Sequence, residues 1–390
     1  LLHFFCYDEY NEKKKRGMRM RKVKTFLKIF LIVIIGLFVY EFMNIDSLID
    51  QSDVDNVFKS DEDYLYNYEK LDENDKKTYR YIYYTYKELY GEINIPENNI
   101  DKVEQIAGYV LLDHPEFFYI DGSFEYRDGK DNISFIPKYQ YSEKEIEKYN
   151  QQIEDNTKEV IKTAKQETSP TKRAKLLYDY VVKNVEYKEN KKTDQNIISS
   201  ILEKKSVCAG YAREYQYLLN RSGMKSSYVV GKANETVGSV NAGEGHAWVM
   251  VNIDDDFYYC DPTWGDNIEK GMEHVCTGYF MMNSEEMLKC YKPEGNYEKT
   301  QKNGLNYFAN EKIYMETYSE LIIDNAVKKG LSNKTRVAEI KCSNEALYKS
   351  VKAKLENAYL GYRILSQNNS FSDNSSYACF DELRLIEIYY

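Results

Sequence analysis

The stretch from residue 206 to residue 261 constrains the fold of this chain more than any other. Cys208 stands at the head of a helical run that ends near Gly223. A short strand over residues 227–231 follows, and a loop rich in Gly, Asn and Ser then reaches a second strand that begins at His246. This order predicts an α+β unit in which one helix packs on an antiparallel sheet.

The strand that begins at His246 forms one arm of a predicted hairpin. Three aspartates at residues 254–256 supply the turn, and residues 257–261 return antiparallel. The point midway between His246 and Asp261 falls at the leading edge of that turn. The two side chains are therefore predicted to lie close together.

Cys208, His246 and Asp261 are the predicted catalytic residues. A cysteine is nucleophilic as a thiolate, which a helix N-terminus and a neighbouring imidazole both stabilise. Asp261 would accept the imidazole N–H and stabilise the imidazolium, with Asp266 as an alternative acceptor. An isolated cysteine is more often a small core residue, and Asp261 could merely cap the turn before Pro262. Because His246 and Asp261 are predicted to lie close together and Cys208 begins the preceding helix, the catalytic role is favoured over these structural roles.

Three sequence blocks carry a family resemblance. Residues 206–212 (SVCAGYA), 245–248 (GHAW) and 261–266 (DPTWGD) resemble, in order and spacing, the signature blocks of the bacterial transglutaminase-like superfamily. The resemblance covers residues 170–266, about a quarter of the chain. One departure is Ser206, where many members have Gly, and this difference could alter the approach to the thiol.

The resemblance implies a papain-like core in which Cys208 is the nucleophile, His246 the base and Asp261 the orienting acid. Members include cysteine peptidases, amidases and protein cross-linkers, all of which pass through a thioester acyl-enzyme. We expect a hydrolytic enzyme that acts on amide bonds of peptides or proteins at the cell surface. A cross-linking transglutaminase is one alternative, and a non-enzymatic binding platform at the cell envelope is another, which a complete triad disfavours.

An apolar run near the N-terminus predicts a membrane anchor. Residues 29–40 are all apolar. Residues 26–43 reach the length of a short membrane span, because Lys28 and Glu41 can extend their charges to the membrane surface. Basic residues precede the run, so the positive-inside rule leaves the N-terminus in the cytoplasm and places the later domains outside the cell. Secretion after signal cleavage is the alternative, although no small-residue cleavage site follows.

Length and patterning divide the chain, because 390 residues exceed what one ordinary core accommodates. The predicted segments are a basic cytoplasmic segment (1–25, with the true start at Met18 or Met20), the anchor (26–43), a flexible stalk (44–74), an N-terminal α+β domain (75–168), a transglutaminase-like domain (169–300) and a C-terminal α+β domain (301–390).

Periodicity predicts the elements within these domains. Helices are expected over residues 77–90, 100–112, 142–166, 170–184, 320–329 and 345–355, and strands over residues 117–120, 124–126, 133–141, 335–341 and 383–389. Ser169 and Pro170 are a typical helix start, with Ser as the N-cap and Pro at the first helical position.

Charge disfavours one class of partner. The first 28 residues hold nine basic and three acidic side chains, and the remainder has a net charge of −16. An acidic chain without a basic cluster after residue 28 disfavours nucleic acid as a binding partner. The expected partners are a peptide or protein substrate and the membrane.

The remaining cysteines and histidines are assigned structural roles. No C-x-x-C pair indicates zinc, and no cofactor or metal is expected. Five further cysteines of the expected outer region are predicted to be buried thiols, with Cys342 and Cys379 as one candidate bridge. His114 and His274 are predicted to be structural.

Overall fold

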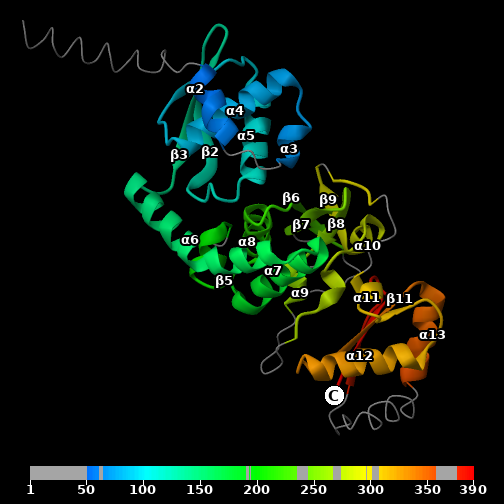
Figure 1. The fold of residues 1–390 in the computed structure, drawn as a ribbon. Coiled ribbons are helices and arrows are strands. Elements are labelled where there is room, and N and C mark those ends of the chain that lie inside the picture. The colour runs from blue at the N-terminus through cyan, green and yellow to red at the C-terminus, as the bar shows by residue number, and fades with distance from the viewer. Residues whose placement is uncertain are drawn as a thin grey trace, which may run out of the picture.

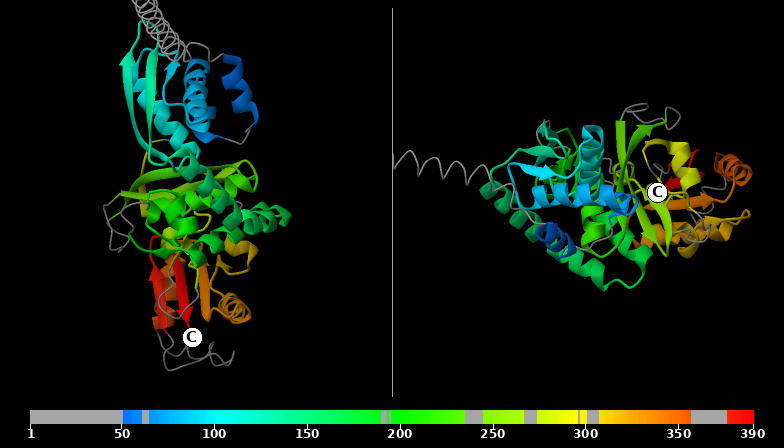
Figure 2. Two further views of the ribbon diagram at one scale, coloured as in Figure 1. Left: turned by 90° about the vertical axis from the view of Figure 1, so that its left-hand side faces the viewer. Right: turned by 90° about the horizontal axis from the view of Figure 1, so that it is seen from above.

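The computed structural model describes residues 51–60, 65–189, 193, 195–234, 245–266, 274–295, 297–300, 307–356 and 376–390. The predicted membrane segment, residues 26–43, lies outside them. Across the described ranges, no helix combines the length and the apolar character that a bilayer crossing requires. The architecture is mixed α+β, and an N-terminal, a central and a C-terminal unit follow one another along the molecule (Figures 1 and 2).

The N-terminal unit packs helices against a three-stranded antiparallel sheet of order β1-β3-β2. Asp72 caps the longest of its early helices by accepting from the backbone N–H groups of Asn74 and Asp75. The elements are α2 (Gln51–Ser60), α3 (Tyr66–Glu69), α4 (Glu73–Lys87), β1 (Ile93–Ile95), α5 (Ile100–Asp113), β2 (Ile120–Asp128) and β3 (Ile133–Tyr139).

Two predictions for this unit were wrong. The expected stalk contains α2 and α3, and Val54 is fully buried because α2 packs on α4 through its apolar positions. The strand expected over residues 117–120 is absent, because residues 117–119 lie in turns, and β2 runs from Ile120 to Asp128 with a register irregularity between Ile120 and Phe124 that accommodates Gly122, whose φ is +85°. The helices predicted over residues 77–90 and 100–112 are confirmed as α4 and α5.

The central unit surrounds a four-stranded antiparallel sheet of order β8-β7-β6-β9, and α8 packs on β6 and β7. Its first helices confirm the prediction: Ser169 caps α7 by accepting from Lys172 N–H, and Pro170 occupies the first turn. The elements are α6 (Glu143–Gln166), α7 (Pro170–Asn184), β4 (Glu186–Tyr187), the π-helix η2 (Ile198–Leu202), β5 (Lys205–Ser206), α8 (Cys208–Arg221), β6 (Ser226–Ala233), β7 (Gly245–Ile253), β8 (Asp256–Cys260), α9 (Pro262–Gly265), the 3₁₀ helix η4 (Thr277–Tyr279), α10 (Ser284–Cys290) and β9 (Tyr291–Glu294).

The predicted hairpin exists, but its register differs from the expected one. Ile253 pairs with Asp256, which centres the turn between Asp254 and Asp255 instead of at its leading edge. Both of these aspartates have positive φ, at 53° and 62°, as a tight two-residue hairpin turn requires. Asp261 consequently leaves the ladder at the end of β8.

The C-terminal unit has a mixed sheet of order β10-β11-β13-β12. Trp248 and Met250 of the central sheet share one hydrophobic cluster with Ile340 and Ile386 of this unit, so the predicted separation of the two units is incomplete. α12 also continues past its predicted end at Gly330. The elements are α11 (Tyr307–Asn310), β10 (Tyr314–Met315), α12 (Glu320–Ser332), β11 (Val337–Cys342), α13 (Glu345–Glu356), β12 (Ser376–Phe380) and β13 (Leu385–Tyr389).

All cysteines in the described part of the chain are free thiols. The candidate bridge between Cys342 and Cys379 is therefore not formed. Cys208 and Cys379 are partly exposed, whereas the other four thiols are buried.

Candidate functional site

Cys208 is the first residue of α8 and is half-buried. The N–H groups of a helix's first turn lack intrahelical acceptors, so the thiol lies at the positive end of a 14-residue helix. Gly210 permits this start, because a Cβ there would lie 1.9 Å from Ser206 Oγ. Ser206, the departure from the family pattern, is itself buried and its hydroxyl bonds to Ser199 Oγ at 2.6 Å. Its side chain is therefore held inside the protein.

His246 lies near the start of β7 and is buried. Its Nε2 lies 2.7 Å from Asp261 Oδ2, and the Cys208 thiol is a second hydrogen-bond partner of the ring. With Nε2 engaged by the carboxylate, Nδ1 is the nitrogen left for the thiol. The structure thus brings the three predicted residues together as a continuous Cys–His–Asp chain.

Asp261 is fully buried and caps α9. Its Oδ1 accepts from the backbone N–H groups of Thr263 and Trp264 at 2.9 and 3.2 Å, which turns Oδ2 toward His246. The capping role and the role as imidazole partner, which the sequence left as alternatives, therefore coexist in one carboxylate. Asp266, the other candidate acceptor, instead accepts from the hydroxyl of Tyr211 at 2.6 Å.

The electrostatics of the site favour the imidazolium. Burial by itself would lower the pKa of His246, but the charge and hydrogen bond of Asp261, with a contribution from Cys208, raise this pKa to about 10. A protonated His246 beside the thiol stabilises the thiolate, as the N-terminus of α8 also does. The arrangement therefore keeps a protonated His246 beside the Cys208 sulfur at neutral pH.

Sequence comparison agrees with this geometry. Residues 157–262 match the profile of the transglutaminase-like superfamily. This chain contains a transglutaminase-like domain. The matched residues include Cys208, His246 and Asp261, and no curated protein matches the sequence.

Solved structures that are similar to this chain include the following three. They are a TGase (15% identity, TM-score 0.25, covering 48% of this chain and 54% of that one), a cysteine protease candidate from Cytophaga hutchinsonii (13%, 0.24, 36% and 61%) and the periplasmic domain of TgpA from Pseudomonas aeruginosa bound to ethylmercury (15%, 0.23, 35% and 59%). The chain thus spans little more than half the length of each.

Sequence reasoning missed one side chain of the transglutaminase-like domain's site, Tyr291. Its hydroxyl donates to Asp261 Oδ2 at 2.6 Å, and its ring stacks on the His246 ring. It stands 30 residues after Asp261, beyond every signature block, and no local pattern distinguishes it from the many other tyrosines. Trp264 is half-buried and also stacks on His246, with a centroid distance of 5.1 Å.

The N-terminal unit holds the helix that carries the thiol. Arg213 and Gln216 of α8 donate to the backbone carbonyls of Leu111 and Leu112, which lie in the last turn of α5. Helix C-termini present carbonyls without intrahelical donors, so these bonds satisfy groups that would otherwise need water. The transglutaminase-like domain is therefore fixed to the unit that precedes it through α8 itself.

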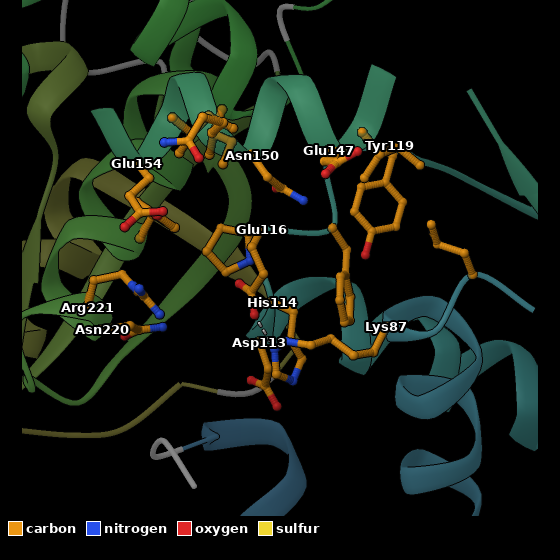
Figure 3. Close-up of a pocket in the computed structure, with 18 of the residues that line it drawn as sticks. Lys87, Asp113, His114, Glu116, Tyr119, Glu147, Asn150, Glu154, Asn220 and Arg221 are labelled. Carbon is orange, nitrogen blue, oxygen red and sulfur yellow. Dashed lines mark hydrogen bonds and ion pairs between the residues drawn. The ribbon is translucent and has the colours of Figure 1, made fainter. Parts of the chain in front are cut away.

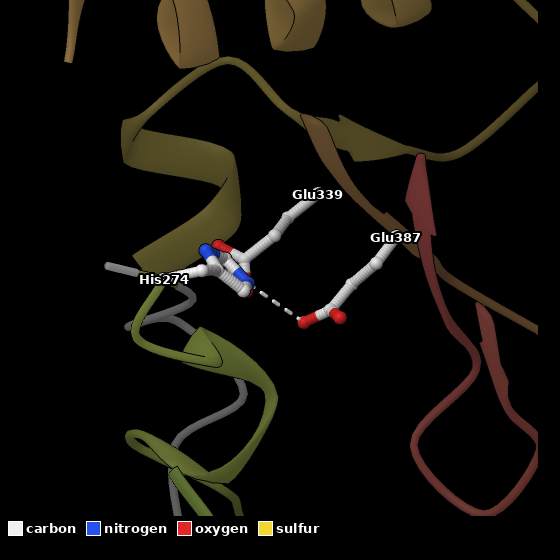
Figure 4. A group of neighbouring side chains, drawn as sticks. All are labelled: His274, Glu339 and Glu387. Atoms are coloured by element: carbon white, nitrogen blue, oxygen red, sulfur yellow. Dashed lines mark hydrogen bonds and ion pairs between the residues drawn. The ribbon is translucent and has the colours of Figure 1, made fainter. Parts of the chain in front are cut away.

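A second buried cluster joins the transglutaminase-like domain to the C-terminal unit (Figure 4). Among the described residues, His274, Glu339 and Glu387 form the group whose ligand atoms all lie within 4.8 Å, as a metal site would require. His274 Nε2 lies 3.0 Å from Glu387 Oε1, and Glu339 Oε1 accepts from Thr277 N–H at 2.6 Å. Hydrogen bonds and opposite charges link the three side chains in this structure.

A cavity of about 680 Å³ lies elsewhere, between the N-terminal unit, α6 and the end of α8 (Figure 3). Asn220 and Arg221 line it from the last turn of α8, whereas Cys208 begins that helix. Twelve residues of helix separate Cys208 from Asn220, a distance of about 18 Å. His114, the C-cap of α5, lies here and bonds to Glu116 at 2.8 Å. This cavity is not the place where the thiol would act.

Proposed function

We propose that this chain is a transglutaminase-like cysteine enzyme that hydrolyses amide bonds of peptides or proteins through a thioester acyl-enzyme. The observation that carries the proposal is the continuous contact from the Cys208 thiol through His246 to Asp261, with the thiol at a helix N-terminus. A nucleophile, a base within reach of it and a group that orients the base are the parts that covalent acyl transfer needs.

In the acylation step, the Cys208 thiolate attacks the carbonyl carbon of the amide. The oxyanion that forms would be stabilised by N–H groups of the first turn of α8. The His246 imidazolium then gives its proton to the amide nitrogen, the C–N bond breaks, and an amine leaves. The acyl group remains on Cys208 as a thioester, and His246 is neutral.

In the deacylation step, neutral His246 takes a proton from water as the water oxygen attacks the thioester carbonyl. The C–S bond breaks, the carboxylic acid leaves, and the thiolate–imidazolium pair is restored. A primary amine could attack in place of water and would give a new amide. The ratio of attack by water to attack by an amine therefore distinguishes the hydrolase from the cross-linking transglutaminase.

The proposal includes the cell surface as the place of action. Its support is the apolar run at residues 26–43 and the basic residues before it, which would anchor the chain with its folded units outside the cell. The substrate would then be a peptide or protein of the cell envelope or its surroundings.

The test follows the fate of the acyl-enzyme. The purified chain is incubated with a library of short amide-capped peptides and a fluorescent primary amine, and the products are identified by mass spectrometry. We expect peptides that have gained water, no products with the Cys208→Ala variant, and alkylation of Cys208 by iodoacetamide faster than that of the buried thiols. Mainly amine adducts would favour the cross-linking alternative.

No turnover, combined with a Cys208 that is alkylated no faster than Cys379, would contradict the enzyme proposal. Cys379 is the matched comparison because it is the other partly exposed thiol of the described chain. That outcome would favour the binding platform.

A further inference from the structure

Tyr291 reaches the candidate site from a separate part of the chain. It ends α10 as its C-cap and begins β9, where it pairs with Ala233 at the edge of the central sheet. Its side chain is almost completely buried. Since the superfamily match ends at residue 262, Tyr291 is supplied by a segment beyond the matched domain.

The hydroxyl of Tyr291 completes the hydrogen bonding of Asp261. A carboxylate has about four acceptor positions, two on each oxygen. Oδ1 is occupied by the N–H groups of Thr263 and Trp264, and Oδ2 by His246 and the hydroxyl of Tyr291 at 2.7 and 2.6 Å. The carboxylate is thereby held from both ends, and no acceptor position is left for water.

The ring of Tyr291 also fixes the plane of the imidazole. Its centroid lies 5.5 Å from that of His246 with an interplanar angle of 14°, so the two rings are nearly parallel. Trp248 stacks on Tyr291 at 4.6 Å and lies 6.0 Å from His246, and Trp264 lies 4.8 Å from Tyr291. Rotation of the imidazole out of its plane would break these contacts.

The hydroxyl remains a donor over the range in which the site would work. Burial, and then the charge of Asp261, raise the pKa of Tyr291 well above its ordinary value of 10. The phenol therefore does not ionise beside the carboxylate. A phenylalanine would fill the same space and keep the stacking, so packing alone does not account for a hydroxyl at this position.

The geometry points to Tyr291 as a positioning residue that sets the orientation of Asp261 and, through it, of His246. This inference rests on the proposed function, because it assigns Tyr291 to the same Cys–His–Asp site. The residue touches neither the thiol nor the reacting carbonyl in the proposed mechanism. It acts by sharing Oδ2 with the imidazole and by limiting the movement of both groups.

The test compares Tyr291→Phe with Tyr215→Phe in the full-length chain. Tyr215 is the matched control because it is equally buried in the same unit and its hydroxyl also donates to an oxygen acceptor, the carbonyl of Ala174, at 3.1 Å, with the Cys260 thiol as a further partner and no bond to Asp261 or His246 among those that the structure describes. The readouts are the far-downfield imidazole N–H proton of His246 and the pH midpoint of its ring, both by NMR. The His246→Ala spectrum assigns the signals.

Loss of the hydroxyl leaves Oδ2 with one donor fewer, which makes the carboxylate a stronger acceptor for His246. We expect the N–H proton of Tyr291→Phe to move further downfield and the midpoint of His246 to rise by roughly one unit, as a hydrogen bond to a charged group is worth. Tyr215→Phe is expected to leave both signals unchanged. Signals of Tyr291→Phe that move no more than those of Tyr215→Phe would overturn the inference.

These readouts do not depend on turnover. If Cys208 proves unreactive while Tyr291→Phe still shifts the His246 signals, the proposed function fails and the positioning by Tyr291 stands. If Cys208 is reactive and the His246 signals do not respond, the proposed function stands and the positioning role fails.

Discussion

In the described part of the chain, two clusters each combine a cysteine, a histidine and a carboxylate. In the first, the Cys208 thiol contacts the ring of His246, and Asp261 lies behind that ring. In the second, the thiol of Cys276 bonds to Glu387, which also holds His274. The residue types are nearly the same, but the order of contact differs.

The order of contact decides what each thiol can do. An imidazolium next to Cys208 stabilises its thiolate, whereas carboxylates next to Cys276 oppose ionisation. Burial, and then the charges of Glu387 and Glu339, raise the pKa of Cys276 well above its ordinary value. Residue composition alone therefore does not identify a nucleophile.

The second cluster places a histidine between two carboxylates of the C-terminal sheet. Glu339 and Glu387 face each other directly across β11 and β13, where like charges destabilise a sheet. His274 lies within 3.8 Å of one and 3.0 Å of the other. Burial opposes its protonation, but the bond to Glu387 and the charge of Glu339 raise the pKa of His274, so that it balances the carboxylates. The cluster fastens the C-terminal sheet to the central unit.

The largest expected effect is on the titration of His246. Its pKa is raised, so the imidazolium is present at neutral pH and is lost as the pH rises through about 10. The ion pair with Asp261 accordingly stabilises the folded protein. This stabilisation is complete below about pH 6.5, the ordinary pKa of histidine, and is lost as the pH rises through about 10. We expect Asp261→Asn to lower the NMR midpoint of His246 by more than two units.

Glu387→Gln serves as the control for that titration, because Glu387 contacts the other histidine. It should shift His274 and leave His246 at its original midpoint. If Glu387→Gln shifted the midpoint of His246 as much as Asp261→Asn does, the two clusters would be electrostatically coupled.

A smaller effect is expected on alkylation of Cys208. An ordinary thiol with a pKa of about 8.5 is only about 1% ionised at pH 6.5, so loss of the paired imidazolium in His246→Ala should slow alkylation by up to about 100-fold. His274→Ala should leave the rate within about twofold, because no thiolate depends on His274. Iodoacetamide labelling with peptide mapping measures both rates, and a similar loss in the two variants would remove the distinction between the clusters.

The smallest effect is expected for the second thiol. Cys276→Ala removes a fully buried side chain and should lower the free energy of unfolding by about 1 kcal/mol, without changing the alkylation of Cys208. Cys208→Ala, at a half-buried position, should cost less. Urea denaturation gives the two values, and a Cys276→Ala variant in which Cys208 becomes unreactive would be the contrary result.

The sequence predicted the first cluster because its parts are local. A helix start, an alternating strand and a hairpin turn place Cys208, His246 and Asp261 within one short stretch, and each element follows from periodicity and turn residues. The hairpin register was predicted incorrectly, yet His246 and Asp261 still meet, because Asp261 leaves the ladder to cap α9.

The second cluster and Tyr291 could not be predicted in the same way. Glu387 is 113 residues from His274, and their contact depends on how the C-terminal sheet docks. Tyr291 is one of 39 tyrosines, and only the pairing of β9 with β6 brings it to Asp261. The helical character of residues 51–60 was missed because the acidic composition of that stretch obscured the few apolar positions that pack on α4.

The hydrophobic cluster shared by the central sheet and the C-terminal unit has a practical consequence for anyone who shortens this protein. A polypeptide that stops after β9 would keep Cys208, His246, Asp261 and Tyr291 but would uncover the side of the sheet that carries Trp248 and Met250. Large exposed apolar patches promote self-association. Such a fragment is expected to precipitate or to form oligomers, so poor solubility of the isolated transglutaminase-like domain would say nothing about its chemistry.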